Sequence, residues 1–298
     1  MPALCFGTDH LMQPAMFWQC GSYTLDLSRP RVMGIVNLTP DSFSDGGLCA
    51  DATRAIKHAE KLVREGADIL DLGAESSRPG AEPLPLKEEL ARLMPVLREA
   101  VRLGVPVSVD TYKADTMREA LEAGASIVND IYALRDAGAL DVVAASQCGV
   151  CLMHMQGAPK TMQQAPRYDD VVSEVLNFLA ERVQACEFSG IDQTRIAVDP
   201  GFGFGKTQSH NLALLRATRR FVNTRQPVLI GVSRKSMIAH WTERTDSPPK
   251  ERVAASVTAA LYAATQGAQV LRVHDVRETV DALRMWTAIH TARETDGP

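Results

Sequence analysis

Residues 31–47 have the sequence RVMGIVNLTPDSFSDGG, an apolar run that stops at Asn37 and gives way to a polar loop closed by two glycines. Apolar residues follow one another within the run with little alternation, which is typical of a parallel β-strand covered on both faces. The segment after the loop carries apolar residues at helical spacing. One stripe of this helix is formed by Ala55, Ala59, Leu62 and Val63.

The unit of strand, loop and helix recurs along the chain. The seven further apolar runs are Asp68–Gly73, Pro106–Thr111, Ser126–Asp130, Gly149–His154, Arg195–Pro200, Pro227–Ser233 and Ala268–His274. Two more helical stripes are formed by Val172, Val175, Leu176, Leu179 and Val183, and by Val276, Val280 and Leu283. Because crossovers between parallel strands are right-handed, eight such units predict a closed (β/α)8 TIM barrel.

The alternative fold is a doubly wound open sheet, but eight units fill the chain and no Pro/Gly/Ser-rich linker separates two halves. We therefore predict one barrel over residues 31–298, because barrels of about 250 residues form a single domain. Residues 1–30 form an N-terminal extension. Within it, Phe17–Cys20 and Ser22–Leu27 flank Gly21 and predict a hairpin that plugs the N-terminal end of the barrel.

The composition limits the class of protein. With 298 residues, 45% hydrophobic content and a formal net charge of −4, the chain is a cored globular protein, not a disordered, fibrous or membrane chain. The charge gives no overall attraction for nucleic acid or anionic membranes, so an anionic ligand requires a local positive cluster. Without a signal-like start, an apolar stretch of roughly 18 residues or a dense cysteine framework, we expect a cytoplasmic protein with free thiols.

Polar residues gather where the predicted strands end, which is the catalytic face of a barrel. They are Asn37, Asp110, Asn129, Asp130, His154, Asp199, Ser233 and His274. An ionisable group that ends an apolar strand is costly unless it is paired or used. Any one of them has a structural alternative as a helix cap or turn residue, but that explanation is weak for the whole ring.

Three loops add detail. Residues 37–47 suggest a lid that carries Phe43, although a plain series of turns explains the loop as well. In ESSRPGA (75–81), Arg78 suits a phosphate or carboxylate, but a surface arginine is the simpler interpretation of that loop alone. DPGFGFGKT (199–207) resembles a nucleotide P-loop, but Pro200 stands where the pattern requires glycine. We instead expect these glycines to let Phe202 or Phe204 approach a flat ligand, unless both rings belong to the core.

Positive charge collects in the last two units. SRKS (233–236) contains Arg234 and Lys235, and Arg272 lies inside an apolar strand that ends near His274. Phosphate groups frequently bind near the loops after strands seven and eight of such barrels, so an anionic substrate or leaving group is expected here. Cys148 and Cys151 have C-x-x-C spacing, but a structural zinc site needs a second pair. His154 is more simply a hydrogen-bonded structural residue than a ligand.

Taken together, these loops resemble the dihydropteroate synthase family, folate-pathway enzymes that sulfonamides target. The matching segments are NLTPDSFSDGG (37–47), ESSRPGA (75–81), SVDTYK (108–113), VNDI (128–131), LMHMQGAPKTMQ (152–163), DPGFGFGKT (199–207), SRKS (233–236) and RVHDV (272–276). Ser77 stands where the family more often has threonine, which keeps the hydroxyl. The resemblance implies condensation of 7,8-dihydropterin-6-ylmethyl diphosphate with 4-aminobenzoate, which yields 7,8-dihydropteroate and diphosphate.

The resemblance also implies roles for individual residues. The pterin would be bound by Asp110, Asn129, Met153, Asp199, Phe204 and Lys235, the diphosphate by Asn37, Arg272 and His274, and 4-aminobenzoate by Phe43, Ser77, Arg78, Pro79 and Ser236. Catalysis would fall to Asp41, Asp110, Asp199 and Lys235, with Mg²⁺ bridging Asn37 and phosphate oxygens. The implied mechanism is dissociative, which calls for electrostatic placement more than for a nucleophile. The implied assembly is a homodimer.

Two other functions remain open on the sequence. A pterin-binding methyltransferase domain would share the pterin carboxylates but has no evident use for ESSRPGA or SRKS. A non-catalytic pterin-binding paralogue would retain the barrel, although none of the expected charged positions is lost. Neither alternative involves nucleic acid or a membrane.

Overall fold

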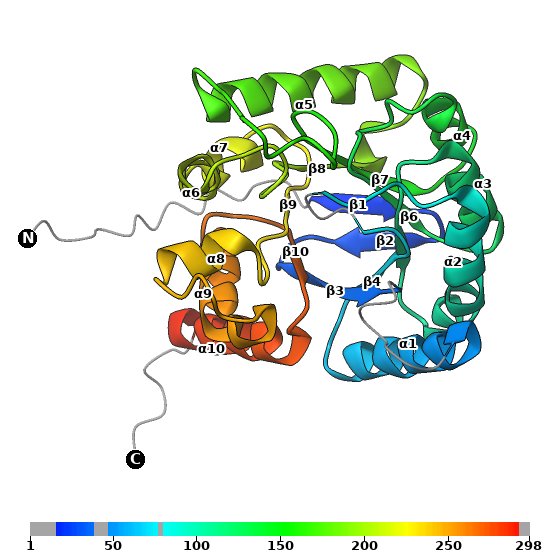
Figure 1. The fold of residues 1–298 in the computed structure, drawn as a ribbon, viewed down its shortest axis with the longest axis horizontal. Coiled ribbons are helices and arrows are strands. Elements are labelled where there is room, and N and C mark those ends of the chain that lie inside the picture. Colours follow the sequence, from blue (N-terminus) through cyan, green and yellow to red (C-terminus); the bar gives the residue numbers. More distant parts are fainter. Residues whose placement is uncertain (1–15, 39–46, 77–79, 292–298) are drawn as a thin grey trace, which may run out of the picture.

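The computed structural model describes residues 16–38, 47–76 and 80–291. Eight parallel strands lie at the centre with helices around them, and a small hairpin sits at one end (Figure 1). The barrel strands are β3 (Arg31–Asn37), β4 (Ile69–Gly73), β5 (Val107–Asp110), β6 (Ile127–Asp130), β7 (Gly149–Met153), β8 (Ile196–Asp199), β9 (Leu229–Ile230) and β10 (Val270–Val273). The hairpin strands are β1 (Phe17–Cys20) and β2 (Tyr23–Asp26).

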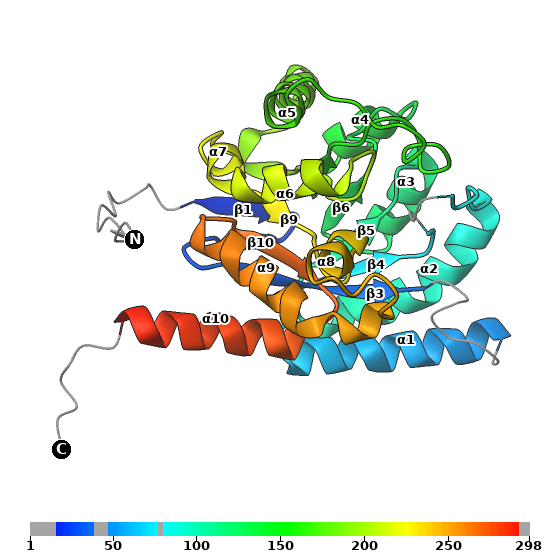
Figure 2. The ribbon, with the colours of Figure 1, turned by 60° about the vertical axis from the view of Figure 1, so that its left-hand side comes forward.

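Ten α-helices are described in these residues. They are α1 (Gly47–Arg64), α2 (Leu86–Ala100), α3 (Ala114–Glu122), α4 (Ala139–Ala144), α5 (Val171–Phe188), α6 (Gln208–Arg216), α7 (Thr218–Val222), α8 (Ser236–Trp241), α9 (Val253–Thr265) and α10 (Val276–Thr291). Figure 2 shows α1 and α10 running end to end beneath the strands, with α9 beside α10. The predicted stripes lie in these helices, with Ala59 and Leu62 of α1 and Val175 of α5 fully or almost fully buried.

The sheet closes on itself. Its strand order is β8-β7-β6-β5-β4-β3-β10-β9, and a parallel bridge from Val198 to Val228 joins the two ends. The amide of Val198 donates to the carbonyl of Pro227 at 2.8 Å across this seam. The predicted barrel, in preference to the open sheet, is therefore confirmed.

Alternation along each strand decides which side chains enter the barrel. In β4, Leu70 and Leu72 pack outward against the helices, whereas Ile69 belongs to the apolar cluster inside the barrel. That interior cluster contains Trp18, Cys20, Leu27, Met33, Ile69, Ile127, Cys151, Ala197, Leu229 and Val270. It fills the N-terminal half of the barrel, so the polar residues further along the same strands lie above an apolar floor.

The hairpin plugs the N-terminal end, as predicted. Trp18 is fully buried, and its indole Nε1 donates to the carbonyl of Arg195 at 2.9 Å. The amide of Gly21 donates to Gln147 at 2.9 Å, so the turn is attached to the loop before β7. Burying an aromatic side chain of this size contributes about 3 kcal/mol or more. The division of the chain at residues 30 and 31 into an extension and a barrel stays a prediction.

The strands differ from their predicted bounds by one or two residues at their ends, and β9 is the exception. Only Leu229 and Ile230 of the predicted Pro227–Ser233 run form a strand. Gly231 follows, and the backbone then leaves the sheet toward the turn that contains Lys235. Of the helices described, none is both long and apolar enough to cross a membrane.

Candidate active site

The C-terminal half of the barrel interior is polar. Period-two alternation places Asn37, Asp71, Asp110, Asn129, Asp199 and Arg272 on the same inward face as the apolar floor. Adjacent strands bring Asp110 beside Asn129, Asp71 beside Ser108, and Met153 beside Asp199. The sequence-predicted pterin residues of strands β5 to β8 therefore share one layer at the mouth of the barrel.

Arg272 forms the centre of this layer. Its Nε donates to Oδ2 of Asp71 at 2.6 Å, and its Nη2 donates to Oδ2 of Asp110 at 2.7 Å. Asn129 Nδ2 lies 3.4 Å from the same Asp71 oxygen. Burial raises the pKa of Asp110 to about 7, and the nearby Asp71 adds to the rise while Arg272 opposes it. The pKa of Arg272 moves upward because its two carboxylate partners outweigh the cost of burial.

Asp71 is a site residue that the sequence interpretation missed. It is fully buried, and its Oδ1 has no hydrogen-bond partner in the described structure. The signal was available, because a carboxylate in the middle of the strand ILDLG is as anomalous as the arginine inside β10. Its orientation makes it the partner that fixes the Arg272 guanidinium.

Lys235 and Asp199 lie on the opposite side of the layer. The ammonium of Lys235 donates to the carbonyl of Phe202 and lies 4.7 Å from the centre of the Phe204 ring. Burial lowers the pKa of Lys235 to about 8, while Asp199 opposes that shift. Burial likewise raises the pKa of Asp199, against the attraction of Lys235. This corner thus holds one cation and one anion with little access to water.

The two phenylalanines of the glycine-rich loop have different positions. Phe202 is fully buried in the main core, so the structural alternative holds for this ring. Phe204 is partly buried and packs at the mouth with Met153, Met155 and Ile131. Of the two rings, Phe204 is the one that a flat ligand can meet.

Asn37, His274 and Ser236 surround the same end of the barrel. Asn37 ends β3, and its backbone pairs with Gly73 of β4. His274 follows β10, and both its amide and its Nδ1 lie within 3.2 Å of the Ser233 hydroxyl. Ser236 begins α8, and its Oγ lies 3.4 Å from Nε2 of Gln208.

Five of the predicted site residues belong to the loops that follow β3 and β4. Asp41 and Phe43 of the first loop, and Ser77, Arg78 and Pro79 of the second, lie outside the described residues. Their assignments stay predictions.

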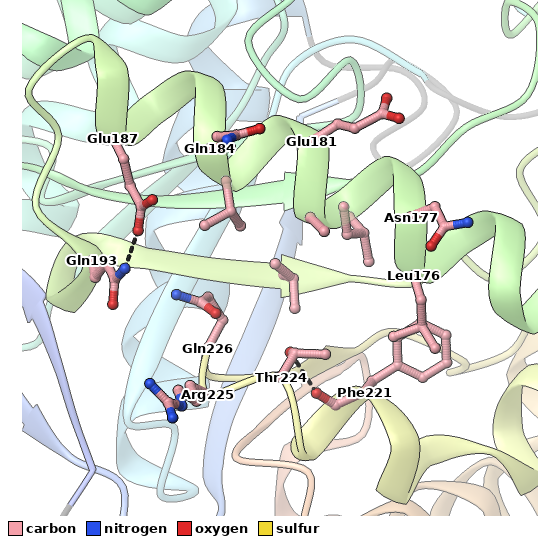
Figure 3. Close-up of a pocket in the computed structure, with 14 residues that line it drawn as sticks. Leu176, Asn177, Glu181, Gln184, Glu187, Gln193, Phe221, Thr224, Arg225 and Gln226 are labelled. Carbon is pink, nitrogen blue, oxygen red and sulfur yellow. Dashed lines mark hydrogen bonds between the residues drawn. The ribbon is translucent and has the colours of Figure 1, made fainter.

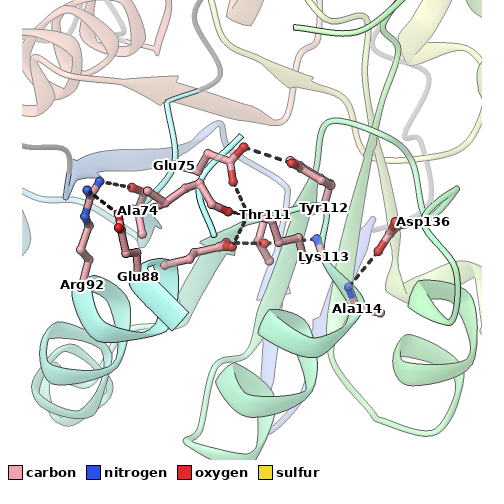
Figure 4. Close-up of polar contacts among 11 residues, drawn as sticks. Ala74, Glu75, Glu88, Arg92, Thr111, Tyr112, Lys113, Ala114 and Asp136 are labelled. Carbon is pink, nitrogen blue, oxygen red and sulfur yellow. Dashed lines mark hydrogen bonds and ion pairs between the residues drawn. The ribbon is translucent and has the colours of Figure 1, made fainter. Parts of the chain in front are cut away.

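The second loop begins at a described polar network (Figure 4). Lys113 pairs with Glu75 and, at 2.7 Å, with Glu89, and the Tyr112 hydroxyl donates to Glu75 at 3.1 Å. Glu89 is almost fully buried and also accepts from Thr111 at 2.6 Å. The network ties the start of the 75–81 loop to the end of β5.

Two other singled-out residues are structural. Asp130 faces outward on β6, and its carboxylate accepts from the amides of Tyr132 and Leu134 at 2.7 Å, as a turn residue does. Arg234 pairs with Asp275 at 2.5 Å instead of pointing to the mouth.

The two cysteines with C-x-x-C spacing lie inside the described part of the chain. Cys148 and Cys151 are free and buried, and no group of three or more His, Cys, Asp or Glu side chains there is arranged to hold a metal ion.

A cavity of about 580 Å³ lies away from this mouth (Figure 3). It lies between α5 and the segment after α7, with Glu181, Gln184, Phe221 and Arg225 among its lining residues. None of the candidate site residues lines it. We place the site at the barrel mouth because the paired and perturbed ionisable groups converge there.

The chain is similar to known proteins over most of its length. A family model described as pterin binding enzyme matches residues 33–274. The dihydropteroate synthase of Escherichia coli strain K12 is 49% identical over 272 residues, which cover 91% of this chain and 95% of that protein.

Two solved structures of Xanthomonas albilineans dihydropteroate synthase are also similar. The one with 4-aminobenzoic acid has a TM-score of 0.88 at 50% identity and covers 94% of this chain and 100% of its own. The one in complex with 7,8-dihydropteroate has a TM-score of 0.84 at 48% identity, with 93% and 100% covered. A family match over most of the barrel and near 50% identity over nine-tenths of the chain lead to one conclusion: the chain belongs to the pterin binding enzyme family and, within it, to the dihydropteroate synthases.

Proposed function

We propose that the polar layer at the barrel mouth condenses 7,8-dihydropterin-6-ylmethyl diphosphate with 4-aminobenzoate, so that the protein acts as a transferase of folate biosynthesis. The observation that carries the proposal is the convergence of Asp110, Asn129, Asp199 and Lys235 around Arg272 above an apolar floor. A pterin edge alternates hydrogen-bond donors and acceptors. Carboxylates, an amide and an ammonium satisfy that edge and reject analogues that lack it.

The remaining roles follow from position. Phe204 and Met153 offer apolar surface to the faces of the pterin ring. Asn37 and His274 stand at the strand ends nearest Arg272 and would receive the diphosphate, and Ser236 with the two loops outside the described residues would receive 4-aminobenzoate. Arg272 already uses Nε and Nη2 for Asp71 and Asp110, so its contribution to the diphosphate is chiefly its charge.

The chemistry is a substitution at the methylene carbon of the pterin. The carbon–oxygen bond to diphosphate breaks first, and its electron pair leaves with the diphosphate. The amine nitrogen of 4-aminobenzoate then forms a bond to the resulting cation and releases one proton. The protein needs to hold both partners and stabilise separated charge, which fixed ionic groups do without a covalent intermediate.

The donor set fits a magnesium ion only together with the substrate. Asn37 offers one amide oxygen at the mouth, and the described residues hold no cluster of acidic or histidine ligands that would bind a cation alone. Mg²⁺ keeps several waters and commonly binds through few protein ligands plus substrate phosphates. When bound by Asn37 and the diphosphate, it would neutralise charge on the leaving group.

We also infer a homodimer and a cytoplasmic location. Tyr262 and Met285 are exposed apolar side chains on α9 and α10, and these two helices lie side by side (Figure 2). Burying this face against a second copy would remove it from water. Light scattering should then report twice the chain mass of 32.4 kDa. Four of the six cysteines, Cys20, Cys148, Cys151 and Cys186, have described side chains and are free, which suits a reducing compartment.

Two variants test the assignment. Lys235→Ala and Asp199→Ala should abolish dihydropteroate formation while far-ultraviolet circular dichroism retains the fold. Lys160→Met, which removes an exposed lysine paired with Glu82, is the matched control and should keep full activity. Product formation at the wild-type rate in either site variant would overturn these roles. Methyl transfer to a corrinoid without condensation would instead favour a pterin-binding methyltransferase, and binding of the pterin diphosphate without turnover in Mg²⁺ would favour a non-catalytic paralogue.

A further inference from the structure

Lys206 is a buried lysine that the proposed reaction does not use. Only 2% of the residue is exposed, and none of the ion pairs among the described residues includes it. A buried charge without an ionic partner costs several kcal/mol unless neutral groups solvate it fully. The groups around Lys206 must therefore explain why a lysine is buried at this position.

The ammonium is solvated by neutral acceptors on two loops. Nζ lies 2.9 Å from the carbonyl of Gly201, 3.0 Å from the carbonyl of Phe204 and 2.9 Å from Nδ1 of His154. A fourth neutral acceptor, the carbonyl of His154, lies 3.4 Å from Nζ, so the hydrogens of the lysine nitrogen all have acceptors within reach. Burial and the charge of Lys206 lower the pKa of His154 to about 3, which keeps the ring neutral.

The loops after β7 and β8 are pressed together around this lysine. A side chain at Gly201 would place its Cβ 1.9 Å from the carbonyl oxygen of His154, and one at Gly205 would place it 2.4 Å from the carbonyl oxygen of Gln156. Both glycines also have a positive φ, +72° and +63°. The backbone of residues 201–205 can thus lie flush against residues 154–156 only with glycine at these positions.

The same loop carries the pterin-binding groups. The amide of Gly201 donates to Oδ1 of Asp199 at 2.7 Å, while its carbonyl accepts from Lys206. The ring of Phe204 lies beneath Lys235, while the Phe204 carbonyl accepts from Lys206. Lys206 therefore bonds to Gly201, the residue whose amide holds the Asp199 carboxylate. It also bonds to the backbone of Phe204, whose ring lies at the mouth.

We propose that Lys206 is a positioning residue for the pterin site, acting as an internal hydrogen-bond donor that fixes the 201–205 loop and through it Asp199 and Phe204. Lys206 contacts no substrate in this account. Its removal should weaken pterin binding, because Asp199 and Phe204 lose their fixed geometry, and should leave the 4-aminobenzoate loops unchanged. The identity of the ligand in this inference rests on the proposed function, whereas the rigidity of the loop does not.

Three measurements test it. Lys206→Met keeps the length of the side chain without its donors, and Lys160→Met is the exposed control. Hydrogen exchange of peptides that cover residues 200–206 needs no ligand and should accelerate at least tenfold in Lys206→Met only. Calorimetry with 7,8-dihydropterin-6-ylmethyl diphosphate should show a Kd raised at least tenfold, and steady-state kinetics should show a KM for 4-aminobenzoate within twofold of wild type.

The outcomes separate the two claims. Unchanged loop exchange overturns the positioning role, as does unchanged pterin affinity in a protein whose wild type binds. A wild-type protein that fails to bind the pterin overturns the proposed function alone, because the exchange result then still decides the role of Lys206. If Lys206→Met does not fold, Lys206→Gln and His154→Ala replace it. These variants retain part of the donor and acceptor set and should give intermediate effects, and wild-type exchange in both would refute the inference.

Discussion

Removal of the Arg272 guanidinium gives the sharpest energetic prediction. Arg272→Met keeps most of the side-chain volume but leaves Asp71 and Asp110 inside the barrel without their shared cation. Breaking a buried ion pair by removal of one partner costs about 3–5 kcal/mol, because the remaining charge is uncompensated. We expect Arg272→Met to lower the free energy of unfolding by about that amount at pH 8.

The pH dependence of this loss identifies its cause. In the wild type, Asp110 already has a pKa raised to about 7. Without Arg272, which opposes that rise, the pKa of Asp110 increases further, so the native variant binds a proton that the unfolded chain releases, and its stability falls as pH rises. A group that titrates only in the native state changes stability by about 1.4 kcal/mol per pH unit. Because the wild-type Asp110 itself titrates near pH 7, the loss should be smaller at pH 6 than at pH 8 by up to about 1.4 kcal/mol.

Urea denaturation followed by far-ultraviolet circular dichroism at pH 6, 7 and 8 measures both quantities. Arg118→Met is the matched control, because Arg118 pairs with Asp115 at the same 2.6 Å as Arg272 with Asp71 but is exposed. An exposed pair contributes about 1 kcal/mol at most. Adding Asp71→Asn to Arg272→Met should restore part of the stability. A loss below about 1 kcal/mol at pH 8, or one that grows toward acid pH, would refute the reasoning.

Three further outcomes are expected. Pterin affinity should be highest between pH 7 and 8 and fall on both sides, because Asp110 gains a proton below about 7 and Lys235 loses one above about 8; a calorimetric profile flat from pH 5.5 to 9.5 would contradict this. Gly201→Ala should weaken pterin binding far more than Gly203→Ala in the same assay, since both have positive φ but only the first meets a backbone oxygen at 1.9 Å. Trp18→Ala should cost about 3–5 kcal/mol of stability in urea and leave kcat unchanged, because the residue is fully buried at the opposite end of the barrel; a tenfold fall in kcat would count against that separation.

The fold follows closely from the sequence because each barrel strand lies in an apolar run and the predicted stripes lie in α1, α5 and α10. The failure at β9 has a physical reason. PVLIGVS has the composition of a strand throughout, but tertiary context lets the chain leave the sheet after Ile230 toward Lys235. Composition reports burial, and Val232 is indeed buried, yet it does not report where hydrogen bonding stops.

The site residues could be predicted from the sequence only where the sequence also showed which face of its strand each side chain occupies. Asp130 and Asn129 are neighbours in sequence, but they face opposite sides of β6, so one caps a turn and the other enters the mouth. Asp71 could have been found from its place in an apolar strand. Lys206 could not, because its partners are backbone carbonyls and a ring nitrogen, which a sequence pattern does not reveal.

The most direct test of the central claim is a coupled assay of diphosphate release under multiple turnover, with 7,8-dihydropterin-6-ylmethyl diphosphate as substrate. We predict sustained release that requires both 4-aminobenzoate and Mg²⁺, with one 7,8-dihydropteroate formed for each diphosphate. Release that continues unchanged without 4-aminobenzoate, or no release with all components present, would contradict the account.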